Sequence, residues 1–456
     1  MDTFKVGFSR VNINPPLGIG VHGYYKPRFA SGFIDDLTVS SIALEYGETR
    51  VLLVSIDLCE LPTWLCEEYR AAIAERTGVP AENIFLSCTH THTGPVITHC
   101  TAFACDDGPV DTYRAFVGVR LQDGAQLALD TLLPAKMGFI VGWAPERVAY
   151  IRRYKMKDGS TWTCPPIGDP NIDHPIGTLD QRVNVLRFDR EGGDTVVLMN
   201  YGLHADTLNV DLISSDWPGW MQRTFETAVP GTKVAFFNGC EGDVGSTHVF
   251  PEGGDMNDTL ISFDNEMKSP GMARFVGRAL AGTILQVYDK VEYVDVDGLA
   301  VLWKNVRVAA NVPDPADLPR AHEYKRLHEE CGDEGIPYSA MELTTVVAEA
   351  LRMCDLENGP DHFDLGLCGL AIGPVALVGI PGEPFTAIGV GIKEAEGWKC
   401  ILPVCLTNGC EGYFPMKDAF DEGGYEARSS VFKGGVGEAI IDGGISLLNE
   451  LREGRQ

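Results

Sequence analysis

Two histidines separated by one residue, His90 and His92, are the residues in this 456-residue chain best spaced for chemistry. On an extended strand, residues two apart point to the same face, so both imidazoles can approach one point. Metal sites use this spacing, but two buried and hydrogen-bonded histidines also explain it. A third histidine, His204, also follows an apolar run, in a chain with only 10 histidines. Three histidines at strand ends favour a metal site, and catalytic zinc takes most of its ligands from His, Asp and Glu.

Other polar side chains follow apolar runs in the same way. Glu383 stands between a glycine and a proline, where a carboxylate is either exposed on a turn or held inward by a cation. Tyr413 and Tyr425 lie in a glycine-rich segment, and both could simply be aromatic side chains that pack in the core. Cys88, two residues before His90, offers a competing thiolate, although a buried thiol that packs as a small hydrophobe is the preferred interpretation.

The adjacent pair Arg152 and Arg153 offers positive charge for an anionic group or a developing oxyanion. Adjacent residues on a strand point to opposite faces, so we expect only one of the two to face a site.

These residues need strands that end at one place. Residues 51–58 and 83–88 read as buried strands, and residues 62–76 between them read as an amphipathic helix. The resulting β-α-β unit ends directly at His90, and ligand sites in open α/β sheets lie at such carboxyl ends. We therefore predict an α/β fold with a mixed β-sheet core flanked by helices and a metal site at the carboxyl ends of the strands.

The same pattern recurs along the chain. Strand-like runs at 195–201, 233–237, 370–372, 376–380 and 401–406 each precede polar residues or a tight turn. The phrases at 238–243 and 408–413 nearly repeat each other, which is expected of two pseudo-symmetric halves that meet at one site. Coincidental glycine turns explain the repeat equally well. We expect one catalytic domain over residues 1–456, with a peripheral helical insertion at about 313–360.

The amino-acid composition limits the kinds of partner and the cellular location that we expect. The 37 basic and 64 acidic side chains give a formal charge of −27, which repels nucleic acid and anionic membranes, so we expect neither as a partner. No signal peptide is visible at the N-terminus, and no apolar run reaches the roughly 20 residues of a membrane span. The 13 scattered cysteines form no Cys-x-x-Cys pair and read as reduced thiols, which favours a cytoplasmic location. Neither a Walker A phrase nor a Gly-x-Ser-x-Gly elbow occurs.

Taken together, these phrases resemble the amidase domain of the neutral ceramidase family. The chain's Thr-His-Thr-His-Thr-Gly-Pro at 89–95 is close to the family's Thr-His-Thr-His-Ser-Gly-Pro, and the segments 23–24, 34–37, 382–383 and 424–426 are similar as well. The resemblance implies a zinc ion, one per chain, held by His90, His204, Glu383 and Tyr413. It also implies that His92 handles protons, and that Tyr425 and an arginine, Arg152 or Arg153, stabilise the oxyanion. His99 and His174 are left as structural residues.

Two departures from the family concern the substrate. Gly245 stands where the family has its active-site serine, and Ser246 comes one residue late. The chain also ends at Gln456, so that we expect a short, divergent member without the family's C-terminal β-sandwich domain or a secretion signal. Both departures weaken ceramide as the substrate, whereas all four implied metal ligands are present.

The expected activity is therefore zinc-dependent hydrolysis of an amide bond in a small soluble N-acyl compound. Two alternatives stay open: hydrolysis of a C–O bond in an ester, lactone or glycoside, and a metal-stabilised binding protein without turnover. Specificity is expected to lie in the loops at 96–111, 155–178 and 246–270. The sequence leaves the oligomeric state open and also admits manganese or iron.

Overall fold

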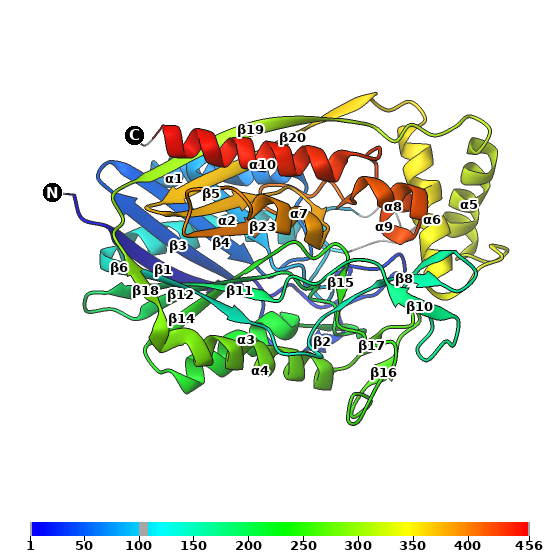
Figure 1. The fold of residues 1–456 in the computed structure, drawn as a ribbon, viewed down its shortest axis with the longest axis horizontal. Helices are drawn as coiled ribbons and strands as arrows, with labels where there is room; N and C mark the ends of the chain where they lie inside the picture. The colour runs from blue at the N-terminus through cyan, green and yellow to red at the C-terminus, as the bar shows by residue number, and fades with distance from the viewer. Residues whose placement is uncertain (1, 100–107, 455–456) are drawn as a thin grey trace.

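The computed structural model describes residues 2–99 and 108–454, in which two main β-sheets are stacked with helices outside them, beside smaller sheets of two or three strands (Figure 1). The larger sheet is mixed and has nine strands. Eight of them lie in the order β14-β12-β11-β6-β1-β3-β4-β5, and β18 pairs with β6. Their bounds are β1 Lys5–Asn12, β3 Thr38–Tyr46, β4 Thr49–Ile56, β5 Ile84–Cys88, β6 Leu133–Trp143, β11 Arg182–Arg190, β12 Thr195–Tyr201, β14 Thr232–Asn238 and β18 Glu292–Val294.

The smaller sheet has four strands in the order β19-β20-β21-β23. Their bounds are β19 Leu299–Ala309, β20 His362–Ile372, β21 Val375–Gly379 and β23 Cys400–Val404. The predicted mixed α/β fold is thereby confirmed, because both sheets contain antiparallel and parallel pairs and both carry helices.

One supersecondary unit occurs three times in this architecture. In each copy an antiparallel strand pair is followed by a helix and a further strand that lies parallel to the second one. The copies are β3-β4-α1-β5, β11-β12-α3-β14 and β20-β21-α7-β23, with α1 at Thr63–Thr77, α3 at Asp216–Ala228 and α7 at Thr386–Ile392. The chain thus holds one more such unit than the two half-units expected from the repeated phrases.

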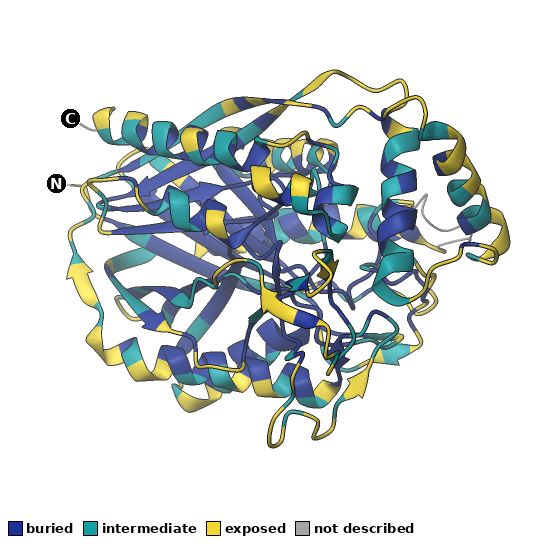
Figure 2. Ribbon diagram, turned by 45° about the vertical axis from the view of Figure 1, so that its right-hand side comes forward, coloured by how far each residue is buried: buried dark blue, intermediate teal, exposed yellow. Residues whose placement is uncertain are grey.

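The core lies between the two sheets and beneath the helices. The inner faces of both sheets meet in one apolar cluster that includes Phe85, Phe237 and Leu402. Helices α1 and α2 (Val110–Asp130) cover one half of the large sheet, α3 and α4 (Pro270–Val287) cover the other half, and α7 and α10 (Val436–Glu453) cover the small sheet. Figure 2 shows this as buried strands with helices exposed on their outer sides. Each fully buried large side chain contributes about 1.5–3 kcal/mol.

The large sheet curves so that its two terminal strands, β5 and β14, come into contact. Beside them, the hydroxyl of Ser55 in β4 donates a hydrogen bond to the carbonyl of Phe236 in β14 at 2.6 Å. The small sheet joins at the same place, where the Cys405 N–H donates to the Asn238 carbonyl and the Cys88 N–H to the Leu406 carbonyl. The carboxyl ends of strands from all three units therefore meet at one point.

The segment expected as a helical insertion contains α5 (Leu318–Cys331) and α6 (Ala340–Leu356). The pair stands at the end of the molecule opposite the chain termini (Figure 1). Arg428 of α9 (Tyr425–Ser429) forms ion pairs with Glu342 and Glu349 of α6, at 2.8 and 2.6 Å. This contact fixes α6 beside the strand ends.

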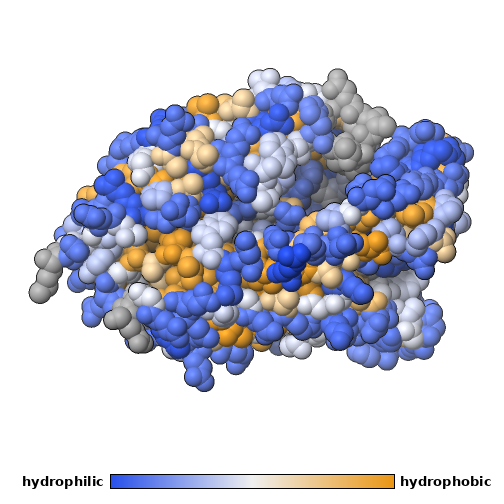
Figure 3. Space-filling model, turned by 90° about the horizontal axis from the view of Figure 1, so that it is seen from above, coloured by the Kyte–Doolittle hydropathy of each residue, from blue (hydrophilic) through white to orange (hydrophobic). Residues whose placement is uncertain are grey.

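The surface is mixed. On the face shown in Figure 3, hydrophobic side chains form scattered patches among predominantly hydrophilic ones. A search of residues 2–99 and 108–454 finds no helix with the length and apolar character that a membrane crossing requires.

Candidate metal centre and active site

Four buried side chains, His90, His204, Glu241 and Glu383, converge where the strands end. One donor atom of each lies within 4.8 Å of those of the other three. His90 follows β5, His204 follows β12, Glu241 follows β14, and Glu383 begins the short strand β22 (Glu383–Pro384) after β21. Each of the three units therefore supplies at least one member of the cluster.

The hydrogen bonds of the two histidines turn one nitrogen of each ring inward. Nδ1 of His90 lies 2.9 Å from the Cys59 carbonyl, and Nδ1 of His204 lies 3.0 Å from the carbonyls of Glu241 and Val244. Carbonyl oxygens only accept, so both Nδ1 atoms carry a hydrogen, and Nε2 is the atom of each ring that faces the cluster. These two Nε2 atoms lie 3.3 and 3.2 Å from the same Glu383 oxygen.

Three carboxyl oxygens of the cluster make no hydrogen bond to the described residues. In the part of the chain that the structure describes, Oε2 of Glu383 and both carboxyl oxygens of Glu241 are buried without a hydrogen-bond partner. Buried carboxylates in this condition cost several kcal/mol unless a cation neutralises them. Imidazole nitrogens and carboxylate oxygens are ligands that zinc accepts, so the donor set fits a divalent metal ion.

The electrostatics of the cluster also call for positive charge. Burial raises the pKa of Glu241 to about 8, and burial together with the Arg152 charge lowers the pKa of His204 to about 3. Burial likewise lowers the pKa of His90, but Cys59 and Glu383 outweigh it and raise that pKa well above its usual value. A proton on His90 thus provides in the metal-free protein the charge that a cation would otherwise supply.

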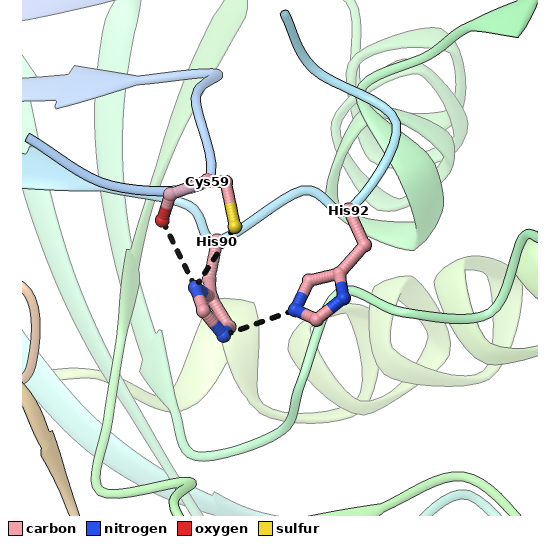
Figure 4. Close-up of side chains that lie close together, drawn as sticks. All are labelled: Cys59, His90 and His92. Atoms are coloured by element: carbon pink, nitrogen blue, oxygen red, sulfur yellow. Dashed lines mark hydrogen bonds between the residues drawn. The ribbon is translucent and has the colours of Figure 1, made fainter. Parts of the chain in front are cut away.

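His92 lies beside the cluster and points its ring at His90 (Figure 4). Its Nε2 is 3.2 Å from Nε2 of His90, and its Nδ1 is 3.4 Å from Oδ2 of Asp206. Burial first, and then the neighbouring His90 and His204, lower the pKa of His92 well below its usual value. His92 is therefore a neutral imidazole. The backbone of His90 has φ +70°, a strained conformation for a non-glycine residue that recurs at functional sites.

The structure distinguishes the two arginines. Arg152, next to β7 (Tyr150–Ile151), donates to the Tyr413 hydroxyl at 3.1 Å and to Glu426 at 2.7 Å, and its Nη1 lies 3.3 Å from Nε2 of His204. Arg153 points the other way, into an ion pair with Glu422 at 3.0 Å. Arg152 is thus the one at the site.

The two tyrosines lie on the same side as Arg152. Tyr413 belongs to β24 (Tyr413–Phe414), and its register partner in the parallel strand β22 is Glu383, which places the two side by side. Tyr425 begins α9, and its ring centroid is 5.5 Å from that of Tyr413. Both therefore face the same cavity.

This cavity has a volume of about 330 Å³ and contains most of the predicted site residues in its walls. They are His90, His92, Arg152, Glu383, Tyr413 and Tyr425, whereas His204 lies behind the wall. Met341 and Thr344 of α6 also line the cavity, so the helical segment expected to be peripheral borders the site. Other wall residues come from the hairpin of β16 (Leu260–Ile261) and β17 (Met267–Lys268).

Sequence reasoning did not find three residues of the site: Cys59, Asp206 and Glu241. Glu241 and Asp206 had a signal, since Glu241 lies in one of the two repeated phrases after a strand and Asp206 comes two residues after His204. The remaining candidates lie elsewhere: Cys88 is buried in the core beneath α1 and α2, and His99 and His174 are exposed beside Asp111 and Asp173.

Comparison of whole structures relates this architecture to known proteins. Neutral ceramidase from Pseudomonas aeruginosa superposes with a TM-score of 0.70 at 17% identity, covering 99% of this chain and 75% of that one. The chain shares the neutral ceramidase fold. A second structure, described as ceramidase complexed with C2, gives a TM-score of 0.71 at 16% identity and covers 99% of this chain and 76% of that one. The sequence itself matches no family model and no curated protein. The resemblance to neutral ceramidases expected from short phrases is confirmed at the level of the fold.

Proposed function

We propose that this protein is a zinc-dependent hydrolase that cleaves an amide bond in a small N-acyl substrate. The observation that carries the proposal is the convergence of two histidine Nε2 atoms on one buried Glu383 oxygen, beside Arg152 and Tyr413. The ceramidase fold supports it, because the resemblance implies amide hydrolysis at this place. A cytoplasmic location stays a prediction from the sequence.

His90, His204, Glu383 and Tyr413 would hold one zinc ion per chain, with Glu241 beside them. A zinc ion held there would lower the pKa of a water molecule from about 15.7 towards 7 and polarise an acyl carbonyl. His204 suits this role because burial and Arg152 keep it neutral, as a ligand must be.

The residues of the chain itself supply proton transfer and charge stabilisation. His92 accepts the proton of the attacking water at Nε2 and passes it to the leaving amine, while Asp206 lies 3.4 Å from Nδ1 of the same ring. Arg152 and Tyr425 donate hydrogen bonds to the oxyanion, and each such donor is typically worth about 3 kcal/mol of barrier. Arg153 takes no part, because it is paired with Glu422.

A second candidate is hydrolysis of a C–O bond at the same metal site. Gly245, in place of the family's serine, favours it, because the site differs from the family's where that serine would stand. A metal-stabilised binding protein would hold zinc without turning over any acyl substrate.

The test combines metal analysis with a substrate screen. Purified protein is expected to contain one zinc per chain, and His90→Ala and Glu383→Ala should lose it, whereas the exposed control His174→Ala should keep it. The screen sets N-acyl amino acids, N-acyl sugars and short ceramides beside matched esters and glycosides. Full metal content in both site variants would refute the metal site. Faster turnover of esters or glycosides would favour the second candidate, and bound zinc without any turnover would favour the binding protein.

A further inference from the structure

The cavity wall beside the metal cluster contains a buried charge network centred on Lys268. The ammonium of Lys268, whose side chain is 1% exposed, contacts Asp206 at 2.7 Å, Asp264 at 3.0 Å and Glu266 at 2.8 Å. Lys268 also donates to the Tyr24 hydroxyl at 2.7 Å. One ammonium faces three carboxyl groups, so the network places more acidic than basic groups next to the cavity.

Glu266 is the member of this network that reaches towards the reacting groups. Its Oε2 contacts Lys268, which leaves Oε1 on the side of Gly245, and Glu266 lines the cavity. A Cβ at Gly245 would lie 3.2 Å from this Oε1 and 3.8 Å from Cβ of Arg152. Gly245 does not have a positive φ, so its backbone does not require glycine. The missing side chain at this position makes room for the Glu266 carboxylate beside Arg152.

The charge of the cavity argues for the kind of group that binds there. Besides Glu383, the carboxylates of Glu60, Asp206, Asp264 and Glu266 line the cavity. Among the described residues that line it, Arg152 alone has an arginine or lysine side chain. Covering such carboxylates with a hydrocarbon chain would remove water without replacing its hydrogen bonds. Burial raises the pKa of Glu266 to about 7, and a donor on the substrate would supply a hydrogen bond that favours the charged form.

We propose that Glu266, in the space left by Gly245, is a specificity-determining residue that accepts a hydrogen bond from a hydroxyl or ammonium group of the substrate near the scissile bond. The inference rests on the proposed amide hydrolysis and narrows its substrate class. The substrate is then a polar compound that carries hydrogen-bond donors, and a long hydrocarbon chain is disfavoured on this wall.

The experiment compares amides that differ in their donors. N-acetylglucosamine carries hydroxyls, N-acetyl-1,4-diaminobutane carries an ammonium, and N-acetylcyclohexylamine carries neither. Zinc-loaded wild type should show a kcat/KM at least about 10-fold higher for one of the donor-bearing amides than for N-acetylcyclohexylamine, the range expected of a charge-assisted hydrogen bond. The hydroxyl and ammonium probes identify which donor Glu266 takes.

Two variants and a control test the residue. Glu266→Gln removes the charge, and Gly245→Ser keeps every charge but fills the space next to Oε1; both should lose most of the preference. Glu252→Gln, an exposed residue, should retain it. Thermal unfolding of each variant identifies any that fails to fold, and Gly245→Ser then decides the matter if Glu266→Gln is unstable. An unchanged preference in folded Glu266→Gln, or no preference in wild type, would overturn the inference.

Calorimetric binding of the amines separates this inference from the proposed function. Glucosamine or 1,4-diaminobutane should bind wild type more tightly than cyclohexylamine does, and Glu266→Gln should lose that difference. If no amide is cleaved while this difference is present, amide hydrolysis is refuted and the Glu266 subsite stands. If amides are cleaved but neither kcat/KM nor binding depends on Glu266, the subsite is refuted and the hydrolase stands.

Discussion

The segments 238–243 and 408–413 share the phrase Asn-Gly-Cys-Glu-Gly, and each follows the last strand of one of the three units, yet they use its glutamate differently. Glu241 is fully buried among His90, His204 and Glu383. Glu411 is half-buried and accepts a hydrogen bond from the hydroxyl of Thr63, at the start of α1. The same residues after the same kind of strand therefore do not have the same role.

The asparagines of the two phrases behave more alike. Oδ1 of Asn238 accepts from the Leu203 N–H at 3.2 Å, and Oδ1 of Asn408 accepts from the Leu86 N–H at 2.9 Å. Asn238 thus ties its loop to the residues just after β12, and Asn408 ties its loop to the middle of β5. The phrase specifies the turn and its anchor, whereas the surrounding sheet decides where the glutamate points.

Replacement of each glutamate by glutamine should give the largest difference in zinc affinity between the two phrases. Glu241→Gln is expected to weaken zinc binding by at least about 10-fold, since groups that support or provide metal ligands carry effects of 10-fold to 100-fold. Glu411→Gln should leave zinc affinity unchanged. Competition with a chelator measures both, and equal losses would mean that the two phrases contribute alike.

The second glycine of each phrase provides a smaller contrast. A Cβ at Gly242 would lie 2.5 Å from the Glu383 carbonyl oxygen, so Gly242→Ala should cost about 1–3 kcal/mol and also displace Glu383, weakening zinc binding. Gly412 has φ +87° and open space around the position of a Cβ, so Gly412→Ala should cost about 1–2 kcal/mol of backbone strain alone. Urea unfolding gives the costs, and zinc titration shows whether only Gly242→Ala moves the metal site.

Replacement of the asparagines tests the shared anchor. Asn238→Ala and Asn408→Ala each leave a buried N–H without its acceptor, at a cost of about 1–3 kcal/mol of unfolding free energy. Only Asn238→Ala should also change zinc affinity, because its amide connects Thr89 to Leu203, next to His90 and His204. A comparable loss of zinc affinity in Asn408→Ala would contradict this division.

A further effect is a dependence of stability on pH in metal-free protein. Burial raises the pKa of Glu241 from 4.5 to about 8, so the folded chain binds this proton more tightly than the unfolded chain does. The resulting stability is complete below about pH 4.5 and is lost as the pH rises through about 8. Urea unfolding in the presence of a chelator should show a decline from pH 6 to 9 that Glu241→Gln reduces and Glu411→Gln retains. Identical slopes in all three proteins would be evidence against the buried position of Glu241.

The strands and three of the candidate metal ligands could be predicted from the sequence, because an apolar run followed by a polar residue is a local pattern that indicates a buried strand ending at a site. His90, His204 and Glu383 all have it. The orientation of Arg152 rather than Arg153 could not be predicted, since it depends on the pairing of β7 with β15 (Val244–Gly245), far away in sequence.

Long-range contacts explain the other gaps as well. Asp206 gains its role from His92 and Lys268, and Cys59 gains its role from a carbonyl that meets His90. The border of α6 with the cavity depends on ion pairs to Arg428 from a later segment. None of these partners is adjacent in the sequence, so no local pattern indicates them.

The threefold origin of the metal cluster has a mechanical consequence. A cation bound to His90, His204 and Glu383 would join the three units through one ion, in addition to the packing, hydrogen bonds and ion pairs by which they already meet. Binding to the folded chain alone stabilises it in proportion to the logarithm of metal concentration. Amide hydrogen exchange at the ends of β5, β14 and β23 should therefore slow together when metal binds, because one ion would stabilise the junction of all three strand ends.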